Sequence, residues 1–259
     1  MNPRRKGSRT PIEPARIDGI SLLKGVLERS RRDVEEARSQ TKKKDRFKPD
    51  LKFAISFAKH FGTELARVLD PLFPGIRSGE IPSKTARGMK RVDLSYSTAE
   101  TGLALGLSFK SVHKGENEEG NARFIHNMKR NDEELRVEAT SHHLRQPYAV
   151  LIAIVFLPFE SCDDAETSSF ARWVEYLWPL KGRSEPEDAP DRFELVFMSL
   201  YARDGSDLGF YEVGGPEPCP RKGRPEHLLS LEEFVRRLKE VYDRRNGNDF
   251  YFKGEEPQA

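Results

Sequence analysis

Hydrophobic and polar residues alternate strictly along two neighbouring segments, residues 91–97 and 102–110. The apolar members are Val92, Leu94 and Tyr96 in the first segment and Leu103, Leu105, Leu107 and Phe109 in the second. Alternation with a period of two predicts β-strands, because successive side chains of a strand point to opposite faces of the sheet. The short connection between the two segments predicts that they form a β-hairpin.

The hairpin is expected to have one apolar and one polar face. An even-length turn centred on residues 99 and 100 pairs Val92 with Leu107, Leu94 with Leu105 and Tyr96 with Leu103. On the other face Asp93 then lies opposite Gly106, with Ser108 and Lys110 further along. Glycine within a strand often marks the close approach of a ligand or another backbone. We therefore interpret this face, which also carries Gly102, as a candidate site.

The patterns around the hairpin predict an α/β protein. Apolar positions at helical spacing predict helices over residues 18–40, 51–69, 122–145, 168–177 and 230–245. Residues 77–89 are expected to be a loop or to hold a short extra strand. Residues 148–157 contain no charged side chain and predict a strand buried on both faces, parallel to a neighbour. Two further strands, joined by a tight turn, are expected over residues 193–202 and 208–213.

The spacing of Asp93 and the segment Ser108-Phe109-Lys110, together with the order of elements over residues 50–158, resembles the PD-(D/E)xK nucleases, also called restriction-endonuclease-like. In that family an Asp and an acid-x-Lys sequence on paired strands bind magnesium and position water against a phosphodiester. The chain departs from the pattern at Val92, where the family has Pro, and at Ser108, where it has the second acid.

The resemblance implies a mixed central sheet flanked by helices, with a restriction-endonuclease-like αβββαβ core. It divides the chain into three parts, which are a basic N-terminal arm with an amphipathic helix (1–48), the core (49–160) and a C-terminal β-hairpin and helix elaboration (161–259).

The second acid of the site is expected to come from another element, because a single carboxylate would hold a divalent ion poorly. Glu138, on the inward stripe of the helix predicted over residues 122–145, is the first choice, and Glu134, one turn earlier, is the second. Ion pairs to other helix residues are the alternative for both. In the resembled family an acid on the helix before the hairpin often joins the metal site, which nominates Glu64, although Glu64 could equally pair with a cation at the edge of the core.

Each group of the candidate site suits phosphodiester chemistry. Magnesium prefers hard oxygen ligands such as the Asp93 carboxylate. Lys110 can orient the nucleophile or offset charge that grows on the phosphate. The alternative for Asp93 and Lys110 is a cross-strand ion pair worth ~0–1 kcal/mol.

The net charge of +2 is unevenly distributed along the 259 residues. Residues 1–50 carry 15 Lys and Arg against 8 Asp and Glu, whereas the remainder carries 29 against 34. A basic arm on a mildly acidic body is compatible with contact to a phosphate backbone, although a solvated tail has the same composition. The candidates for contact with the DNA backbone are Arg4, Arg5, Lys42, Lys43, Lys44 and Arg145.

Other features argue against a membrane or secreted protein. The longest apolar run, residues 148–157, is too short to span a bilayer. The N-terminus is basic but lacks the apolar region of a secretory signal. Cys162 and Cys219 have no metal-ligand spacing and fit unpaired thiols in a reducing cytosol.

The sequence therefore predicts a cytoplasmic, magnesium-dependent endodeoxyribonuclease of a restriction or phage-defence type, with manganese as a possible substitute. DNA is the expected partner, and the chain is expected to act as a homodimer or as a subunit of a defence complex. Two alternatives remain. One is a catalytically inactive nuclease-fold subunit that binds nucleic acid or protein, for which Ser108 is the supporting feature. The other is an interaction protein with no site at the hairpin.

Overall fold

The computed structural model describes residues 18–41, 47–85, 88–99, 102–116 and 122–246. Its α-helices are α1 (Gly19–Gln40), α2 (Pro49–Leu69), α3 (Met128–His143), α4 (Ser169–Leu177) and α5 (Leu231–Asn246). Its strands are β1 (Arg77–Thr85), β2 (Gly88–Thr98), β3 (Gly102–Ser111), β4 (Gly115–Glu116), β5 (Ala122–Arg123), β6 (Val150–Pro158), β7 (Leu195–Tyr201) and β8 (Leu208–Glu212).

Six of the strands form one mixed sheet in the order β1-β2-β3-β6-β7-β8. The two central pairings, β3 with β6 and β6 with β7, are parallel, and the outer pairings are antiparallel. Every residue of β6 is buried, which confirms the predicted central strand. The strand carries no charged side chains because both of its faces are covered, so a charge on either face would be removed from water.

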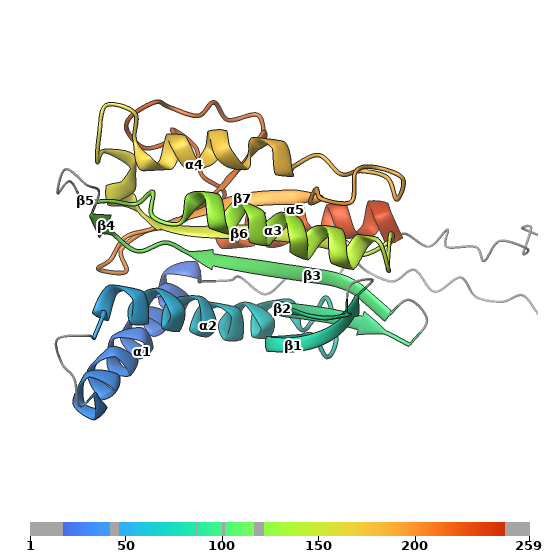
Figure 1. Cartoon of the computed structure of the whole chain (residues 1–259), viewed down its shortest axis with the longest axis horizontal. Helices are drawn as coiled ribbons and strands as arrows, with labels where there is room; N and C mark the ends of the chain where they lie inside the picture. Colours follow the sequence, from blue (N-terminus) through green and yellow to red (C-terminus); the bar gives the residue numbers. More distant parts are fainter. Residues whose placement is uncertain (1–17, 42–46, 86–87, 100–101, 117–121, 247–259) are drawn as a thin grey trace, which may run out of the picture.

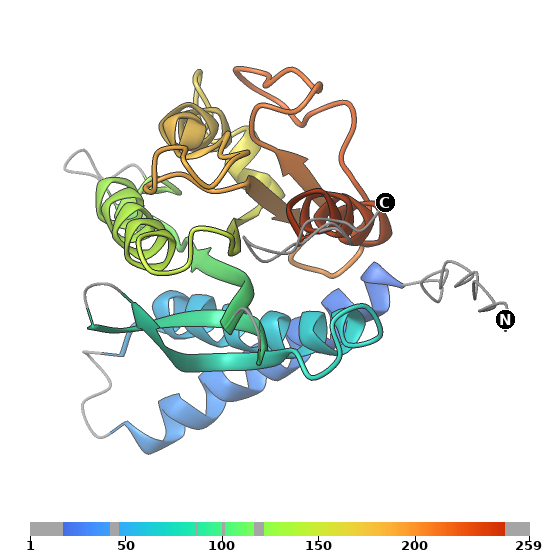
Figure 2. The ribbon, with the colours of Figure 1, turned by 90° about the vertical axis from the view of Figure 1, so that its right-hand side faces the viewer.

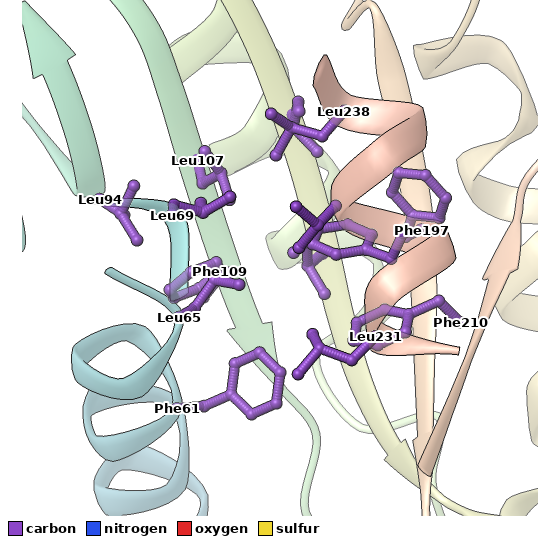
Figure 3. Close-up of a cluster of buried hydrophobic side chains, with 14 of the residues drawn as sticks. Phe61, Leu65, Leu69, Leu94, Leu107, Phe109, Phe197, Phe210, Leu231 and Leu238 are labelled. Carbon is purple, nitrogen blue, oxygen red and sulfur yellow. The ribbon is translucent and has the colours of Figure 1, made fainter. Parts of the chain in front are cut away.

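Helices cover both faces of the sheet (Figures 1 and 2). α1, α2 and α5 pack against one face, where α2 and α5 enclose the cluster that contains Phe61, Leu107 and Leu238 (Figure 3). α3 and α4 pack against the other face around Leu135 and Trp173. The molecule is thus an α/β protein, as the periodicity of the sequence predicted, and its mixed sheet lies between two helical layers.

Several predicted boundaries agree with the structure to within three residues. α1 and α4 begin directly after the predicted first residues, Asp18 and Ser168, whose side chains accept hydrogen bonds from backbone amides of the first turn. At α5 the Ser230 amide donates to Glu233 Oε2, and the Glu233 amide donates to Ser230 Oγ. These reciprocal bonds form a capping box that fixes the start of the helix.

The hairpin of β2 and β3 has a different register from the predicted one. Leu94 pairs with Leu107, and Tyr96 pairs with Leu105, a displacement of two residues. One residue comes from the turn, where Thr98 pairs with Gly102. The other comes from an irregularity of the ladder between Tyr96 and Ser97.

The turn also changes which face the first residues of β3 occupy. Gly102 has a φ of +69°, which glycine adopts without steric cost. Leu103 packs in the core beneath α3 and α4, whereas Leu105 and Leu107 pack in the core beneath α2 and α5. The prediction of a single apolar face was therefore wrong at Leu103.

Candidate functional site

Lys110 lies near the end of β3 and contacts two acidic residues of α3. Its Nζ is 2.8 Å from Glu138 Oε1 and 3.3 Å from Glu134 Oε2. The two acids are four residues apart, so they share one side of the helix. The structure therefore brings Lys110 together with both acids that the sequence nominated from this helix.

Asp93 is anchored to the same strand through the backbone. Its Oδ2 accepts a 2.7 Å hydrogen bond from the amide of Phe109. The paired register ends at Leu94 and Leu107, and one further step places Asp93 beside Ser108 rather than opposite Gly106. Asp93 Oδ2 thus accepts the hydrogen bond that the Phe109 amide would donate to the backbone of β2 if the ladder continued. This bond fixes the carboxyl group next to the Ser108-Phe109-Lys110 segment.

The charges of the cluster stabilise one another. Burial by itself lowers the pKa of Lys110, but the carboxylates of Glu138, Glu134 and Asp93 outweigh it and raise the pKa above the ordinary 10.5. Burial also raises the pKa of Glu134, and hydrogen bonds from Arg130 and Lys110 outweigh that effect and bring the pKa below the ordinary 4.5. At neutral pH Lys110 therefore carries its positive charge and Glu134 its negative charge.

The cluster is open to solvent on one side. The side chain of Lys110 is 13% exposed, that of Glu138 is 21% exposed and that of Glu134 is 41% exposed. Glu134 also accepts a 2.8 Å bond from the exposed Arg130. The exposure rises from the strand towards the helix surface, so an approaching anion or cation would meet Glu134 and Arg130 first.

The two glycines of β3 have a packing role. A Cβ atom at Gly106 would lie 2.9 Å from Cδ2 of Leu151, and one at Gly102 would lie 2.2 Å from Nε2 of Gln146. The side chains of Leu151 and Gln146 therefore occupy the space beside these glycines, where the sequence had suggested room for a ligand. The interpretation of these glycines as signs of ligand approach was therefore wrong, although the polar groups beside them do converge.

Ser108 occupies the position of the missing acid without entering the charged cluster by any described bond. It is buried in β3 and pairs with Ala153 of the parallel strand β6. Glu138 reaches Lys110 from the helix instead.

Glu64 lies in a different part of the molecule. Its Oε1 accepts a 2.7 Å bond from Arg29 of α1 and a 2.8 Å bond from Arg67 of α2. These contacts hold Glu64 in the helical layer that covers the opposite face of the sheet from α3. The structure therefore does not bring Glu64 to Asp93 and Lys110, and the predicted metal role loses its geometric basis.

Of the predicted DNA-backbone residues, Arg145 is the one that falls within the described part of the chain. Arg145 is exposed just beyond the end of α3, seven residues and roughly 10 Å along the helix from Glu138. Arg4, Arg5 and Lys42–Lys44 lie outside the described residues, so their contact with DNA stays a prediction.

One charged cluster was missed by the sequence reasoning. Glu194 is buried before β7, and its Oε2 accepts a 2.8 Å bond from the amide of Leu151. Its carboxylate lies 3.4 Å from Arg183, 3.7 Å from Arg245 and 3.5 Å from His143. An acid between Phe193 and the apolar run of β7 was the available signal, because a carboxylate in such a place must find partners.

The carboxylates of the cluster are potential ligands for a metal ion. Within the described part of the chain, no group of three or more His, Cys, Asp or Glu side chains is arranged to hold a metal ion. Magnesium commonly uses only one or two protein carboxylates and completes its shell with water and substrate phosphate. Asp93 and Glu138 therefore fit magnesium by chemical type, although their oxygens now contact Phe109 and Lys110.

No family model matches the chain, and neither the curated proteins nor the solved structures contain a match to it. The described residues include no helix long and apolar enough to cross a membrane.

Proposed function

We propose that the chain is a magnesium- or manganese-dependent endonuclease that hydrolyses DNA phosphodiester bonds at Asp93, Lys110 and Glu138. The observation that carries the proposal is the convergence of the Lys110 ammonium group with Glu138 and Glu134, beside the strand-anchored Asp93. Two carboxylates can hold a divalent cation, and an amine beside them can offset charge on a phosphate, so these groups suit metal-assisted phosphodiester hydrolysis.

The element order adds support to the proposal. Apart from the two-residue strands β4 and β5, the elements from α2 to β6 follow in the order α2-β1-β2-β3-α3-β6, with β6 parallel to β3. This order is compatible with the αβββαβ core that the resemblance implies. β1 supplies the strand that the sequence had left as either loop or strand. Fold alone does not specify chemistry, so this order strengthens the proposal only together with the charged cluster.

The side chains would divide the work of the reaction. Asp93 and Glu138 would hold the cation, which supplies Lewis acidity to the scissile phosphate when bound. Lys110 would contact a phosphate oxygen and offset the charge that develops in the transition state. Asp93 is held by the Phe109 amide, so it stays in place while the substrate binds. Glu134 would serve as the outer acid, because it is shared with Arg130.

Incubation with supercoiled plasmid tests this proposal. The purified protein is expected to nick or linearise plasmid in magnesium or manganese and to leave it intact in EDTA. Lys110→Ala is expected to lower the rate at least a hundredfold, because removal of a group that stabilises transition-state charge typically costs 10²–10³ in rate. Lys129→Ala is the matched control, since Lys129 lies on the exposed side of α3 and pairs only weakly with Glu133 at 3.9 Å. Equal rates for the two variants would contradict the assignment.

A catalytically silent DNA-binding module is the second candidate, and the buried Ser108 in place of an acid favours it. Such a module would retain DNA in a gel-shift assay without cutting it in any metal. Action as a homodimer or within a defence complex stays a prediction. Sedimentation of the chain, with and without DNA, measures it.

A further inference from the structure

The acidic cluster at the end of β3 already contains a cation, the ammonium group of Lys110. We propose that Lys110 is the resident counter-ion of the Asp93, Glu134 and Glu138 site, and that a divalent metal binds there only after this ammonium group leaves Glu138. The inference rests on the proposed function, because it concerns how the same site acquires its metal. It makes Lys110 a gate on metal loading as well as a group that contacts phosphate.

The short distances make the two cations competitors. Lys110 Nζ is 2.8 Å from Glu138 Oε1 and 3.3 Å from Glu134 Oε2. Magnesium binds carboxylate oxygens at about 2.0–2.1 Å. An ion at that distance from the same Glu138 oxygen would stand close against the ammonium group and repel it strongly. One oxygen of Glu138 therefore serves one of the two cations at a time.

The present arrangement of the acids suits the ammonium group. Within the described residues no set of three metal-ligating side chains is assembled, whereas two carboxylates already bond one nitrogen atom. Asp93 is anchored separately by the amide of Phe109. Metal binding at this oxygen of Glu138 would therefore release Lys110 from its bond.

A substrate phosphate provides a place for the released ammonium group. Lysine has a flexible four-carbon stem and a compact charge, so it can transfer its hydrogen bonds from a carboxylate to a phosphate oxygen. Lys110 is mostly buried, and the opening of the cluster lies on the side of Glu134. A phosphate arriving there would attract Lys110 and free Glu138. By thermodynamic linkage, DNA would then raise metal affinity and metal would raise DNA affinity by the same factor.

Calorimetric titration with manganese chloride, in the absence of DNA, tests the gate. The wild-type chain is compared with Lys110→Met, which removes the charge at similar length, and with Lys129→Met as the matched control on α3. Lys110→Met is expected to bind manganese at least tenfold more tightly than the wild type. The control is expected to match the wild type, because Lys129 lies on the exposed side of α3.

Two further variants keep the comparison decisive. Lys110→Arg retains the positive charge and is expected to bind manganese as weakly as the wild type. Lys110→Gln keeps a hydrogen-bond donor for Glu138 and is expected to bind tightly, so it replaces Lys110→Met if that variant does not fold.

Equal manganese affinity in the wild type and in both uncharged variants would overturn the gate, and so would the absence of binding by all of them. The outcomes remain separable from the proposed function. Metal-dependent cleavage by the wild type with unchanged affinities would remove only the gate. The absence of both cleavage and metal binding would remove the metal-dependent nuclease as well.

Discussion

Lys110 lies at the centre of the candidate site, because its ammonium group contacts both Glu134 and Glu138. Its ammonium group is mostly withdrawn from water, which alone would favour the neutral amine, yet the neighbouring carboxylates raise its pKa above 10.5. Its stabilising contribution is therefore complete below pH 10.5 and is lost only as the pH rises through the higher folded value. For Glu134 the sign is opposite, because its folded pKa lies below the ordinary 4.5. Between these limits Lys110 and Glu134 are both charged.

The lowered pKa of Glu134 gives a prediction for the variant Glu134→Gln. At pH 7 the variant is expected to lose roughly 0.5 kcal/mol of unfolding free energy, a value kept small because Glu134 is substantially solvated. The loss is expected to shrink as the pH falls below 4.5, where the wild-type carboxylate also becomes protonated. Urea unfolding at pH 7 and at pH 3.5 measures both values. A difference that stays constant across this range would contradict the charge-based account.

The site was predictable to the extent that it depends on spacing. Alternation placed Asp93 and Lys110 on one face, and helical spacing selected Glu138 from its helix. The bond from the Phe109 amide to Asp93 was not predictable, because it depends on a turn and a bulge that shift the register by two residues. Glu64 was nominated as a metal ligand from its position beside an apolar stripe, but the same position fits the ion pair that Glu64 forms with Arg29.

At the scale of elements, the hairpin is fixed by packing against its neighbours. β3 is paired on both edges, by β2 and by β6. Leu151 of β6 fills the space that a side chain at position 106 would need. Gly106 is thus part of the contact between β3 and β6, two residues before the Ser108-Phe109-Lys110 segment.

Gly106→Ala is expected to destabilise the fold by about 1–3 kcal/mol, the usual cost of forcing extra volume into a packed core. The same substitution at Gly25 in α1 is the control, because its Cβ would meet only Arg29 at ordinary contact distances. Gly25→Ala is expected to stabilise the helix by roughly 0.5–1 kcal/mol. Thermal unfolding of both variants measures the difference in sign, and stabilisation at both positions would refute the packing role of Gly106.

The bounds of helices and strands were predictable from the sequence where hydrophobic periodicity or a capping residue of the element itself sets them. The beginning of α3 was the main miss, since the helix was expected from residue 122 and begins at Met128. β5 pairs with β4 instead, and the carbonyl of Phe124 accepts a bond from the indole of Trp173. Asn127 then takes a left-handed φ of 59° before the helix. These are contacts with distant parts of the chain, which a local pattern does not reveal.

For the whole molecule, Glu194 joins parts of the chain that are far apart in sequence. It binds the amide of Leu151 at the start of β6 and lies within 3.7 Å of Arg183 and of Arg245 at the end of α5. Both arginines also donate to the carbonyl of Pro147. The carboxylate therefore fastens α5 and the loop before β7 to the end of the sheet opposite Lys110.

Glu194→Gln is expected to lower the free energy of unfolding by about 3–5 kcal/mol, because it leaves buried guanidinium groups without their counter-charge. Glu166→Gln is the control, since Glu166 is exposed and its pair with Arg221 is solvated, and it is expected to change stability by less than about 0.5 kcal/mol. Denaturant unfolding compares the two. A loss below 1 kcal/mol for Glu194→Gln would show that the cluster contributes little to stability.

The central claim is that Lys110 and Glu138 act together on one phosphodiester bond. Its most direct test is the initial rate of plasmid nicking in magnesium by the wild type, Lys110→Ala, Glu138→Gln and the double variant. Residues that act as a unit are strongly non-additive, so the double variant is expected to be no slower than the slower single variant. Independent, multiplicative losses, or variants that nick as fast as the wild type, would contradict a shared site.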